Sequence, residues 1–399
     1  MGIAGVLTSS SAHGFAFEML PPLALYAHMP WCVRKCPYCD FNSHVRPRGT
    51  VPESAYVEKL IVDLEQELRY VGGRSIVSVY FGGGTPSLFS AQALGRLLAQ
   101  VRARVNLAAD CEITLEANPG TVSARHLLDF REVGISRLSL GVQSFHDPQL
   151  RHIGRIHSAT QARIAAEGAI RAGFPSVNVD LMYGLPGQSA ASALRDVSLA
   201  VDVGATHISH YQLTLEPGTS FSRRCPMLPD EDEVADMQEQ CEALLLSGAY
   251  RHYETSAYAR DGHTCRHNLN YWCFGDYVGI GAGAHGKLTD LKRQAITRTV
   301  KHSNPRRYLA CNTGRELTAV RRRLEPQEVM SEFMIDALRL VEGLPLSMFT
   351  VRTGLAVGVI EDIRREAEAR GLMESSSQLI RPTALGRRYL NDLLALWVS

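Results

Sequence analysis

Three cysteines close together near the start of the chain constrain this protein more than any other feature. They lie in the stretch HMPWCVRKCPYCDF, residues 28–41, which holds Cys32, Cys36 and Cys39 of the nine cysteines. A thiolate is a soft ligand that suits zinc or an iron–sulfur cluster. Residues 1–12 contain no Lys or Arg and so lack the charged region of a secretory signal. The stretch therefore predicts a metal or cluster site before a disulfide framework.

The spacing CxxxCxxC narrows the kind of site. Structural zinc sites use four ligands, commonly as two CxxC pairs, and no second such pair exists in the chain. Two alternatives remain: a zinc site completed by His28 or His44, and three unrelated core cysteines. Three thiolates on a four-iron cube leave one iron open to a small molecule, so this spacing favours ligand binding or chemistry over a structural role.

Strand-length apolar runs alternate with amphipathic segments over the first half, which is typical of a parallel α/β fold. The predicted strands are Leu23–His28, Ile76–Phe81, Glu112–Glu116, Arg137–Val142, Val177–Met182 and His207–Leu213. The predicted helices are Glu53–Tyr70, Ala91–Val105, Ala124–Val133, Thr160–Ala172 and Ala190–Val203, and Gly72, Gly134, Gly173 and Gly204 follow several of them as C-caps do. Six βα units predict a partial barrel.

Unusual residues fall where these strands end. The Cys stretch follows the first strand, Gly82–Pro86 the second, and Glu116, Gln143 and Asp180 lie at or near the ends of the next three. The carboxyl ends of barrel strands form one face, which carries ligand sites. Three successive glycines remove every Cβ and are expected to leave N–H groups free for a ligand. We expect one site at this mouth.

The second half is predicted as a helix over Asp230–Ser247, a strand over His252–Ala259 and, from Pro326, a mainly helical, winged-helix-like region. Its predicted elements are a helix over Ile360–Arg370, a strand pair over Met373–Glu374 and Gln378–Arg381, and a helix over Ala384–Trp397. The expected division is an extension (1–21), the barrel (22–235), a bridging region (236–300) and the C-terminal domain (301–399).

Composition limits the function classes. With 45% hydrophobic and 21% charged residues the chain is an ordinary globular protein, and its net charge of +1 gives no overall field for nucleic acid. No stretch approaches the ~20 uncharged apolar residues of a membrane span. We expect a cytoplasmic protein. Residues 287–323 hold eleven Lys and Arg, which predicts a solvated basic face, with an anionic ligand, a partner or a transient membrane contact as alternatives.

The motifs together resemble the radical S-adenosylmethionine (SAM) superfamily, and HMPWCVRKCPYCDFNSH resembles its branch that is similar to coproporphyrinogen oxidase. The resemblance implies a [4Fe-4S] cluster on Cys32, Cys36 and Cys39, with SAM beside it. Gly82–Pro86 resembles the family loop that holds the amino group of SAM. The positions implied to contact SAM are Tyr26, Tyr38, Gly83, Gly84, Thr85, Glu116, Gln143, Arg155 and Asp180.

Two later motifs bear on function. Residues 281–286, GAGAHG, fit GxGxxG, but no Asp or Glu follows about 20 residues on, which argues against a dinucleotide site. The stretch HNLNYW, residues 267–272, resembles the motif of the HemW-type heme chaperones, a subgroup of this branch. It implies a heme ligated by His267 and packed on Tyr271 and Trp272, with cations of residues 287–323 near its propionates. Cys265 and Cys273 are alternative ligands.

The chain departs from the coproporphyrinogen III oxidases at Phe41, where the oxidase pattern CxxxCxxCxC has a further cysteine. The sequence therefore predicts a heme chaperone that passes heme to a respiratory hemoprotein, and a membrane-associated recipient is compatible with this prediction. The alternative is an oxygen-independent coproporphyrinogen III oxidase. Both interpretations share the cluster and SAM, so whether the protein is an enzyme stays open, and Phe41 and HNLNYW separate the two.

Overall fold

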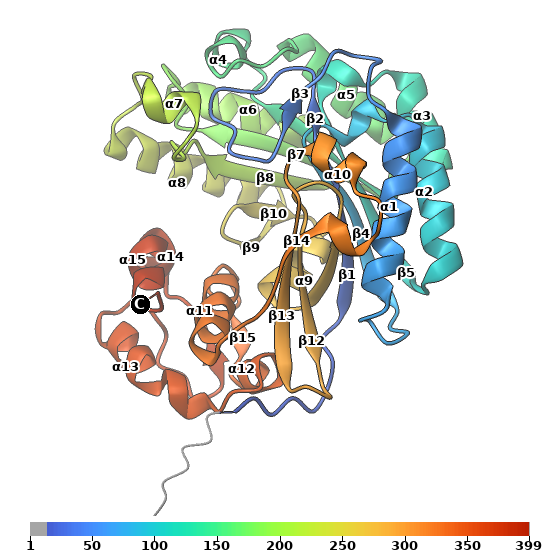
Figure 1. Ribbon diagram of the computed structural model, residues 1–399. Coiled ribbons are helices and arrows are strands. Elements are labelled where there is room, and N and C mark those ends of the chain that lie inside the picture. The colour runs from blue at the N-terminus through green and yellow to red at the C-terminus, as the bar shows by residue number, and fades with distance from the viewer. Residues whose placement is uncertain (1–13, 399) are drawn as a thin grey trace, which may run out of the picture.

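A mixed sheet of twelve strands organises residues 14–398, the part of the chain that this computed structural model describes (Figure 1). Its centre is parallel and runs, in order across the sheet, β11 (Asp276–Ile280), β1 (Leu23–Met29), β4 (Ile76–Gly83), β5 (Leu107–Ala117), β6 (Arg137–Gln143), β7 (Ser176–Tyr183) and β8 (His207–Gln212). The sheet keeps two free edges, so the barrel is partial. All six predicted strands are confirmed, and β11 is a seventh parallel strand that the sequence analysis did not anticipate.

The helices that connect these strands cover the outer face of the sheet (Figure 1). They are α1 (Glu53–Leu68), α2 (Ala91–Arg104), α3 (Ala124–Glu132), α5 (Ala159–Arg171), α6 (Ala190–Asp202) and α8 (Glu231–Ser247). Ser90, Ser158 and Asp230 accept a backbone N–H at three of their N-termini, and this capping explains why the boundaries were readable from the sequence. Gly134 and Gly173 follow α3 and α5 with φ of 102° and 75°, as C-capping glycines require.

Shorter elements complete the connections of the barrel. They are β2 (Trp31–Cys32), β3 (His44–Val45), α4 (Asp147–His152), α7 (Ser220–Arg223), α9 (Arg266–Trp272), α10 (Pro305–Ala310) and the 3-10 turns η1 (Pro86–Leu88), η2 (Pro119–Thr121) and η3 (Arg315–Leu317). The expected single strand over His252–Ala259 is a hairpin, β9 (Arg251–Glu254) and β10 (Ala257–Ala259). The chain turns between them because Thr255 N donates to Arg339 O and Ser256 N to the Glu254 carboxylate.

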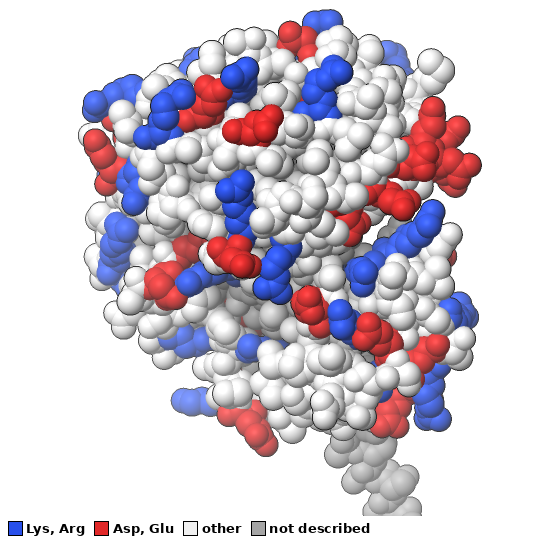
Figure 2. Space-filling view, turned by 180° about the vertical axis from the view of Figure 1, so that it is seen from behind, with Lys and Arg blue, Asp and Glu red and all other residues white. Residues whose placement is uncertain are grey.

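The basic segment forms antiparallel strands that extend the sheet beyond β11. These are β12 (His285–Asp290), β13 (Ala295–Lys301) and β14 (Thr318–Arg323). The expected solvated basic face is present in part: eight of the eleven Lys and Arg of residues 287–323 are exposed, whereas Lys287 and Lys301 are each only 1% exposed. Lys301 Nζ lies 2.6 Å from Asp63 and 2.7 Å from Glu67 of α1, so its charge is neutralised inside the protein. Figure 2 shows both signs of charge mixed over the face opposite to that of Figure 1.

The C-terminal region has a hydrophobic core of its own. It consists of α11 (Pro326–Ala337), β15 (Leu344–Pro345), α12 (Ser347–Thr353), η4 (Val357–Ile360), α13 (Glu361–Ala369), β16 (Leu379–Ile380), α14 (Ala384–Arg388) and α15 (Leu390–Ala395). Phe333, Phe349 and Trp397 are buried in this core together with Phe17 and with Phe274 of the preceding region. Its mainly helical, winged-helix-like character agrees with the prediction.

Two details of this region differ from the prediction. The strand over Leu379–Ile380 pairs with Leu344–Pro345, whereas Met373 forms only an isolated bridge to Pro382, because Ile380 and Leu344 are buried together in the C-terminal core. The last predicted helix is broken at Tyr389, whose φ of −110° and ψ of 46° are not helical. The break lets α15 and the residues after it bury Leu393 and Trp397.

The expected domain limits cross regular elements. Residue 236 lies inside α8, and residue 301 is the last residue of β13. The first thirteen residues of the expected extension lie outside the described range, and Phe17 packs into the C-terminal core. Within residues 14–398, no helix combines the length and the apolar character needed to cross a membrane.

Candidate functional site

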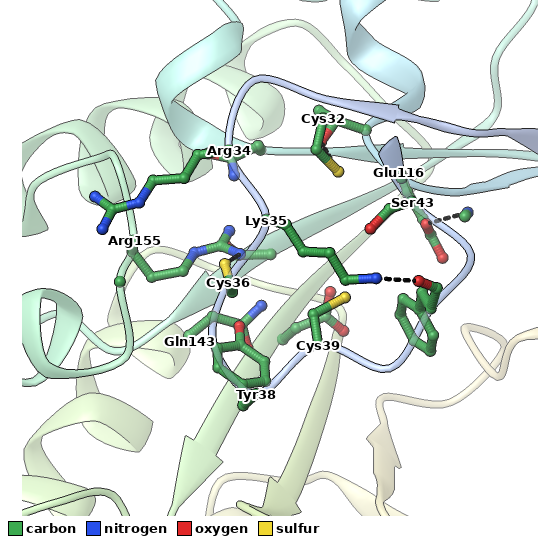
Figure 3. A pocket seen from close by; sticks show the side chains of 18 of the residues that line it. Cys32, Arg34, Lys35, Cys36, Tyr38, Cys39, Ser43, Glu116, Gln143 and Arg155 are labelled. Atoms are coloured by element: carbon green, nitrogen blue, oxygen red, sulfur yellow. Dashed lines mark hydrogen bonds between the residues drawn. The ribbon is translucent and has the colours of Figure 1, made fainter. Parts of the chain in front are cut away.

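A cavity of about 260 Å³ lies at the carboxyl ends of the central strands. Its walls come from the carboxyl-terminal halves of β4 to β8 and from the segments that follow β1, β4, β5, β6 and β8, as expected for a barrel mouth. Figure 3 shows the three cysteines around this cavity, with Arg155, Gln143 and Tyr38 near Cys36 and with Glu116 on the side of Cys32. The structure brings these predicted residues together in the lining: Cys32, Cys36, Tyr38, Cys39, Gly83, Gly84, Thr85, Glu116, Gln143, Arg155 and Asp180. Tyr26 and His267 lie outside it.

Cys32 ends β2, and Cys36 and Cys39 lie in the irregular segment that follows; we call residues 32–42 the Cys loop. All three thiols are free. The Thr85 hydroxyl donates to Cys32 Sγ at 3.4 Å, and Arg155 Nη1 donates to Cys36 Sγ at 3.6 Å. Burial raises the pKa of the Cys32 and Cys39 thiols, so a metal is needed to hold them as thiolates at neutral pH.

The surroundings of the thiols bear on which metal group they fit. Neither His28 nor His44, the two candidates for a fourth zinc ligand, lines the cavity. His28 Nε2 instead donates to Asn42 O at 2.8 Å, and His44 Nε2 lies 3.2 Å from Asn42 Oδ1. Among residues 14–398, no three His, Cys, Asp or Glu side chains are grouped tightly enough to hold a single metal ion. Three thiols around one cavity fit a larger group with an open position, as a four-iron cluster has.

The glycine loop after β4 differs from the expectation of free N–H groups. Gly84 N donates to Met29 O and Thr85 N to Trp31 O, both at 2.8 Å, and Gly83 N donates to the Glu116 carboxylate at 3.0 Å. A Cβ on Gly84 would lie 2.6 Å from Trp31 O. The glycines therefore let the loop pack against the backbone that leads into the Cys loop, and the expectation that their amides are free was wrong.

Two carboxylates line the cavity from β5 and β7, the strands on either side of β6. Glu116 Oε1 accepts from Tyr80 OH at 2.8 Å, and Asp180 Oδ1 accepts from Asn178 Nδ2 at 2.8 Å. Burial is the main cause that raises the pKa of Glu116 to about 7, with the nearby charge of Asp180 adding to it. Burial likewise raises the pKa of Asp180. Two buried carboxylates are a suitable environment for a cationic ligand, whose charge would favour their ionised forms.

Arg155 and Gln143 line the cavity near Cys36 (Figure 3). Arg155 Nη2 donates to Gly141 O at 2.5 Å, whereas its buried Nε has no partner. Gln143 Oε1 accepts from Tyr211 OH at 2.7 Å, and Gln143 has a positive φ of 70° that turns the chain at the end of β6. An unpaired guanidinium N–H beside a cavity suits an anionic group such as a carboxylate.

Tyr26 and His267 lie outside the cavity lining and pack on Tyr80, the tyrosine that holds Glu116. Tyr26 OH donates to His28 Nδ1 at 3.1 Å, and its ring stacks on Tyr80, so it supports the cavity without lining it. His267 in α9 is 1% exposed and stacks on Tyr80 with ring centroids 4.7 Å apart. Its Nδ1 lies 2.9 Å from Ser78 Oγ, and its Nε2 is buried without a partner. Burial lowers the pKa of His267 to about 3, so the imidazole is neutral.

The expected heme environment is not assembled as an open surface. Trp272 faces the C-terminal region, where Arg339 lies over its ring at 4.3 Å. One cation of the basic segment, Lys287, is buried over Phe274 and donates to Phe274 O at 3.0 Å. Aromatic packing of His267 on Tyr271 is present, with ring centroids 4.9 Å apart, but Lys287 is paired inside the protein, because a buried charge requires a partner.

Comparison with known proteins decides the family. The Radical SAM superfamily profile matches residues 26–200, and the HemN C-terminal domain profile matches residues 324–389. A protein of Escherichia coli K12 named heme chaperone HemW is 47% identical over 380 residues, which cover 95% of this chain and 99% of that protein. The chain belongs to the HemW family. The heme chaperone HemW of Haemophilus influenzae is 43% identical over 384 residues, with 95% and 99% of the two chains covered.

The solved structure of E. coli coproporphyrinogen III oxidase (HemN), described as a radical SAM enzyme, shares the fold. It superposes with a TM-score of 0.79 at 21% identity and covers 95% of this chain and 90% of that one. At this identity the likeness establishes the architecture, including the C-terminal domain, and no activity.

Sequence reasoning missed two tyrosines that shape the site. Tyr80 and Tyr211 hold Glu116 and Gln143 by the hydrogen bonds described above. Tyr80 stands two residues before Gly82 on a predicted strand, so the strand period places both on one face and could have revealed it. The cavity also has Lys35 and Phe41 in its lining, and Lys35 Nζ donates to Phe41 O at 2.9 Å (Figure 3).

Proposed function

We propose that this protein is a heme chaperone that binds heme and delivers it to a respiratory hemoprotein, and that it carries a [4Fe-4S] cluster and SAM. The observation that carries the proposal is that relatives named heme chaperone HemW match it at 47% and 43% identity over 95% of its length. The three thiols around one cavity and the departure at Phe41 support it.

Cys32, Cys36 and Cys39 would hold the cluster, and SAM would occupy the adjoining cavity. SAM carries a sulfonium, an ammonium and a carboxylate. Glu116 and Asp180 offer acceptors for its cationic groups or ribose hydroxyls, and the unpaired Nε of Arg155 offers a donor to its carboxylate. When bound, the two groups supply one-electron chemistry at the open iron. The residues of the chain bind and orient them, and Gly83, Gly84, Thr85, Gln143, Tyr38 and Tyr26 shape the cavity.

His267 is our candidate heme ligand. Metal-binding histidines commonly have one ring nitrogen held by a hydrogen bond, and here Nδ1 lies beside Ser78 Oγ while Nε2 is unpaired. Because the side chain is 1% exposed, heme can reach Nε2 only when the rings of Tyr80 or Tyr271 move aside. We place this cycle in the cytoplasm, with transfer by direct contact to a recipient hemoprotein that is soluble or bound at a membrane.

Heme titration tests the proposal. The wild-type protein, His267→Ala and the matched control His126→Ala, at an exposed histidine of α3, are titrated with heme while the Soret band is followed. We expect a shifted and weakened Soret band for His267→Ala alone. An unaltered spectrum for that variant would transfer the ligand role to Cys265, Cys273 or His285.

The oxidase alternative is tested separately. Reconstituted protein is incubated anaerobically with coproporphyrinogen III, SAM and a reductant, and the products are analysed. We expect no turnover, and accumulation of protoporphyrinogen at enzymatic rates would establish the oxidase instead of the chaperone.

A further inference from the structure

Each cysteine of the Cys loop is secured by a different part of the fold. The Cys32 end pairs with the loop after β4, through Thr85 N and Trp31 O at 2.8 Å. The Cys36 region rests on residues that follow β6, since Arg155 reaches Cys36 Sγ and a Cβ on Gly154 would lie 2.8 Å from Pro37. Both anchors lie within the matched radical SAM region, residues 26–200. The Cys39 end is secured from much further along the chain.

Asn42 makes that third attachment, three residues after Cys39. Its Nδ2 donates one hydrogen to Ala282 O and the other to Ser303 O, both at 2.9 Å. Its own carbonyl accepts from His28 Nε2. Both hydrogens of the Asn42 amide are therefore bonded to backbone carbonyls that lie 240 and 261 residues later in the chain, one within GAGAHG and one shortly after it.

The contact between Asn42 and the loop 281–284 explains the first two glycines of the GxGxxG spacing, Gly281 and Gly283. A Cβ on Gly283 would lie 2.1 Å from Asn42 Nδ2, and a Cβ on Gly281 would lie 2.4 Å from His28 O. Both glycines have positive φ, 86° and 101°, which other residues rarely adopt. A bound dinucleotide phosphate is not needed to explain why these two positions are glycine. Backbone atoms of His28 and side-chain atoms of Asn42 already fill the space next to them.

The loop 281–284, which contacts the Asn42 side chain, is held in place by other residues of the protein and does not depend on a cluster. Gly281 N donates to Asp63 Oδ2 and Ala282 N to Tyr56 OH, and Tyr56 OH in turn donates to His28 O at 2.8 Å. Asp63 and Tyr56 belong to α1, so the loop 281–284 is fixed to the barrel independently of the Cys loop. Through the Asn42 hydrogen bonds, the loop 281–284 fixes the position of the Cys39 end of the Cys loop.

We propose that Asn42 and the loop 281–284 are positioning residues that hold the Cys39 end of the Cys loop in the geometry required for the cluster. The inference rests on the proposed function in one respect, the presence of a cluster on Cys32, Cys36 and Cys39. In this proposal GAGAHG supports the Cys loop, and it belongs to a segment outside the matched radical SAM region.

A double-mutant cycle tests this coupling. Asn42→Ala, Gly283→Ala and the double variant are reconstituted anaerobically, and the rate of iron release to an excess of chelator is measured. Asn312→Ala and Gly358→Ala are matched controls, because Asn312 is exposed and a Cβ on Gly358 has no atom within 4 Å. The unfolding midpoint of each apo variant is recorded separately, so that the strain of Ala at φ 86° is not counted as a cluster effect.

We expect each single variant to release iron about tenfold faster than wild type, as the loss of one or two net hydrogen bonds implies. Because Gly283→Ala acts by displacing the Asn42 side chain, the double variant should release iron no faster than Asn42→Ala alone. The electron paramagnetic resonance spectrum of the reduced cluster should change in the single variants and not in the controls. Asn42→Asp, which keeps the size but lacks both donors, should behave as Asn42→Ala.

Two results would overturn the inference: wild-type release rates in both single variants, or rates that multiply in the double variant. Either can occur while the wild-type protein holds a full cluster, in which case only the positioning role is lost. If the wild-type protein itself binds no iron, the failure belongs to the proposed function.

Discussion

At the scale of single residues, the site depends on side chains held by specific partners. Cys36 stands beside Arg155, Glu116 is held by Tyr80, and His267 has Nδ1 beside Ser78 while its Nε2 is unpaired. Each of these contacts joins residues that are distant in sequence. Substitutions at these positions can therefore test cluster binding and the protonation of Glu116 separately.

Replacing Cys36 by Ser should abolish the brown chromophore and the iron and sulfide content, because two thiolates hold a cube poorly. Iron and sulfide analysis after anaerobic reconstitution measures this. Cys225→Ser, at an exposed cysteine, should keep the full complement. A full complement in Cys36→Ser would contradict the cluster assignment.

Glu116 should make the ligand-free protein less stable as pH rises. Its pKa is about 7 in the folded protein and near 4.5 when unfolded, so the folded state binds the proton more tightly. The free energy of unfolding therefore falls between about pH 4.5 and 7, and the full penalty, on the order of 3 kcal/mol, is present above pH 7.

The variant Glu116→Gln should remove this contribution. Denaturant unfolding of the apo protein at pH 5 and pH 8 should show the variant gaining stability relative to wild type at the higher pH. Glu112→Gln is the matched control, since Glu112 lies outside the cavity. An equal difference between variant and wild type at both pH values would show that Glu116 titrates normally.

At the scale of elements, buried charges join α1 to β13. Lys301 contacts both Asp63 and Glu67, and Asp63 also accepts from Tyr308 OH and Gly281 N. This network supports the loop 281–284 through the hydrogen bond from Gly281 N to Asp63. It also explains why part of the basic segment is inside the protein.

Lys301→Met should destabilise the protein by about 3–5 kcal/mol, because it leaves Asp63 buried without its cation. Denaturant unfolding gives the value. Lys292→Met, at an exposed position of the same hairpin, should change stability by less than about 0.5 kcal/mol. A similar small effect at Lys301 would contradict the stabilising role of its buried charge.

At the scale of the whole molecule, two hydrophobic cores meet near α9. One fills the barrel, and the other joins residues 324–397 to Phe17, Phe274 and Ile296. Phe333 in α11 packs edge-on against Phe274 and Phe349, with ring centroids 5.6 and 5.2 Å apart. Because the two cores are separate, we expect that the C-terminal region can be destabilised without destabilising the barrel.

Phe333→Ala should cost about 3–5 kcal/mol in the C-terminal core and leave the barrel protected. Hydrogen exchange followed by mass spectrometry should show faster exchange in residues 324–398 and unchanged exchange in β6. Ile335→Ala, at an exposed position of the same helix, is the control. Equal acceleration in β6 would mean that the two cores unfold as one unit.

The sequence by itself determined six of the seven parallel strands, most helix ends of the barrel and the grouping of residues at the barrel mouth. These features are local: strand and helix periods and N-caps such as Ser158 act within a few residues, and parallel strands necessarily bring their ends together. For the same reason the strand pattern alone places Glu116, Gln143 and Asp180 near the cysteines.

Only the tertiary structure decided how those residues are used. It showed that the amides of Gly83 and Gly84 are already bonded, that Tyr26 lies outside the cavity lining, and that His267 is buried. It also paired Asn42 with Ala282, 240 residues later. Such contacts depend on which distant atoms fill a given space, and neither period nor spacing in the sequence carries that information.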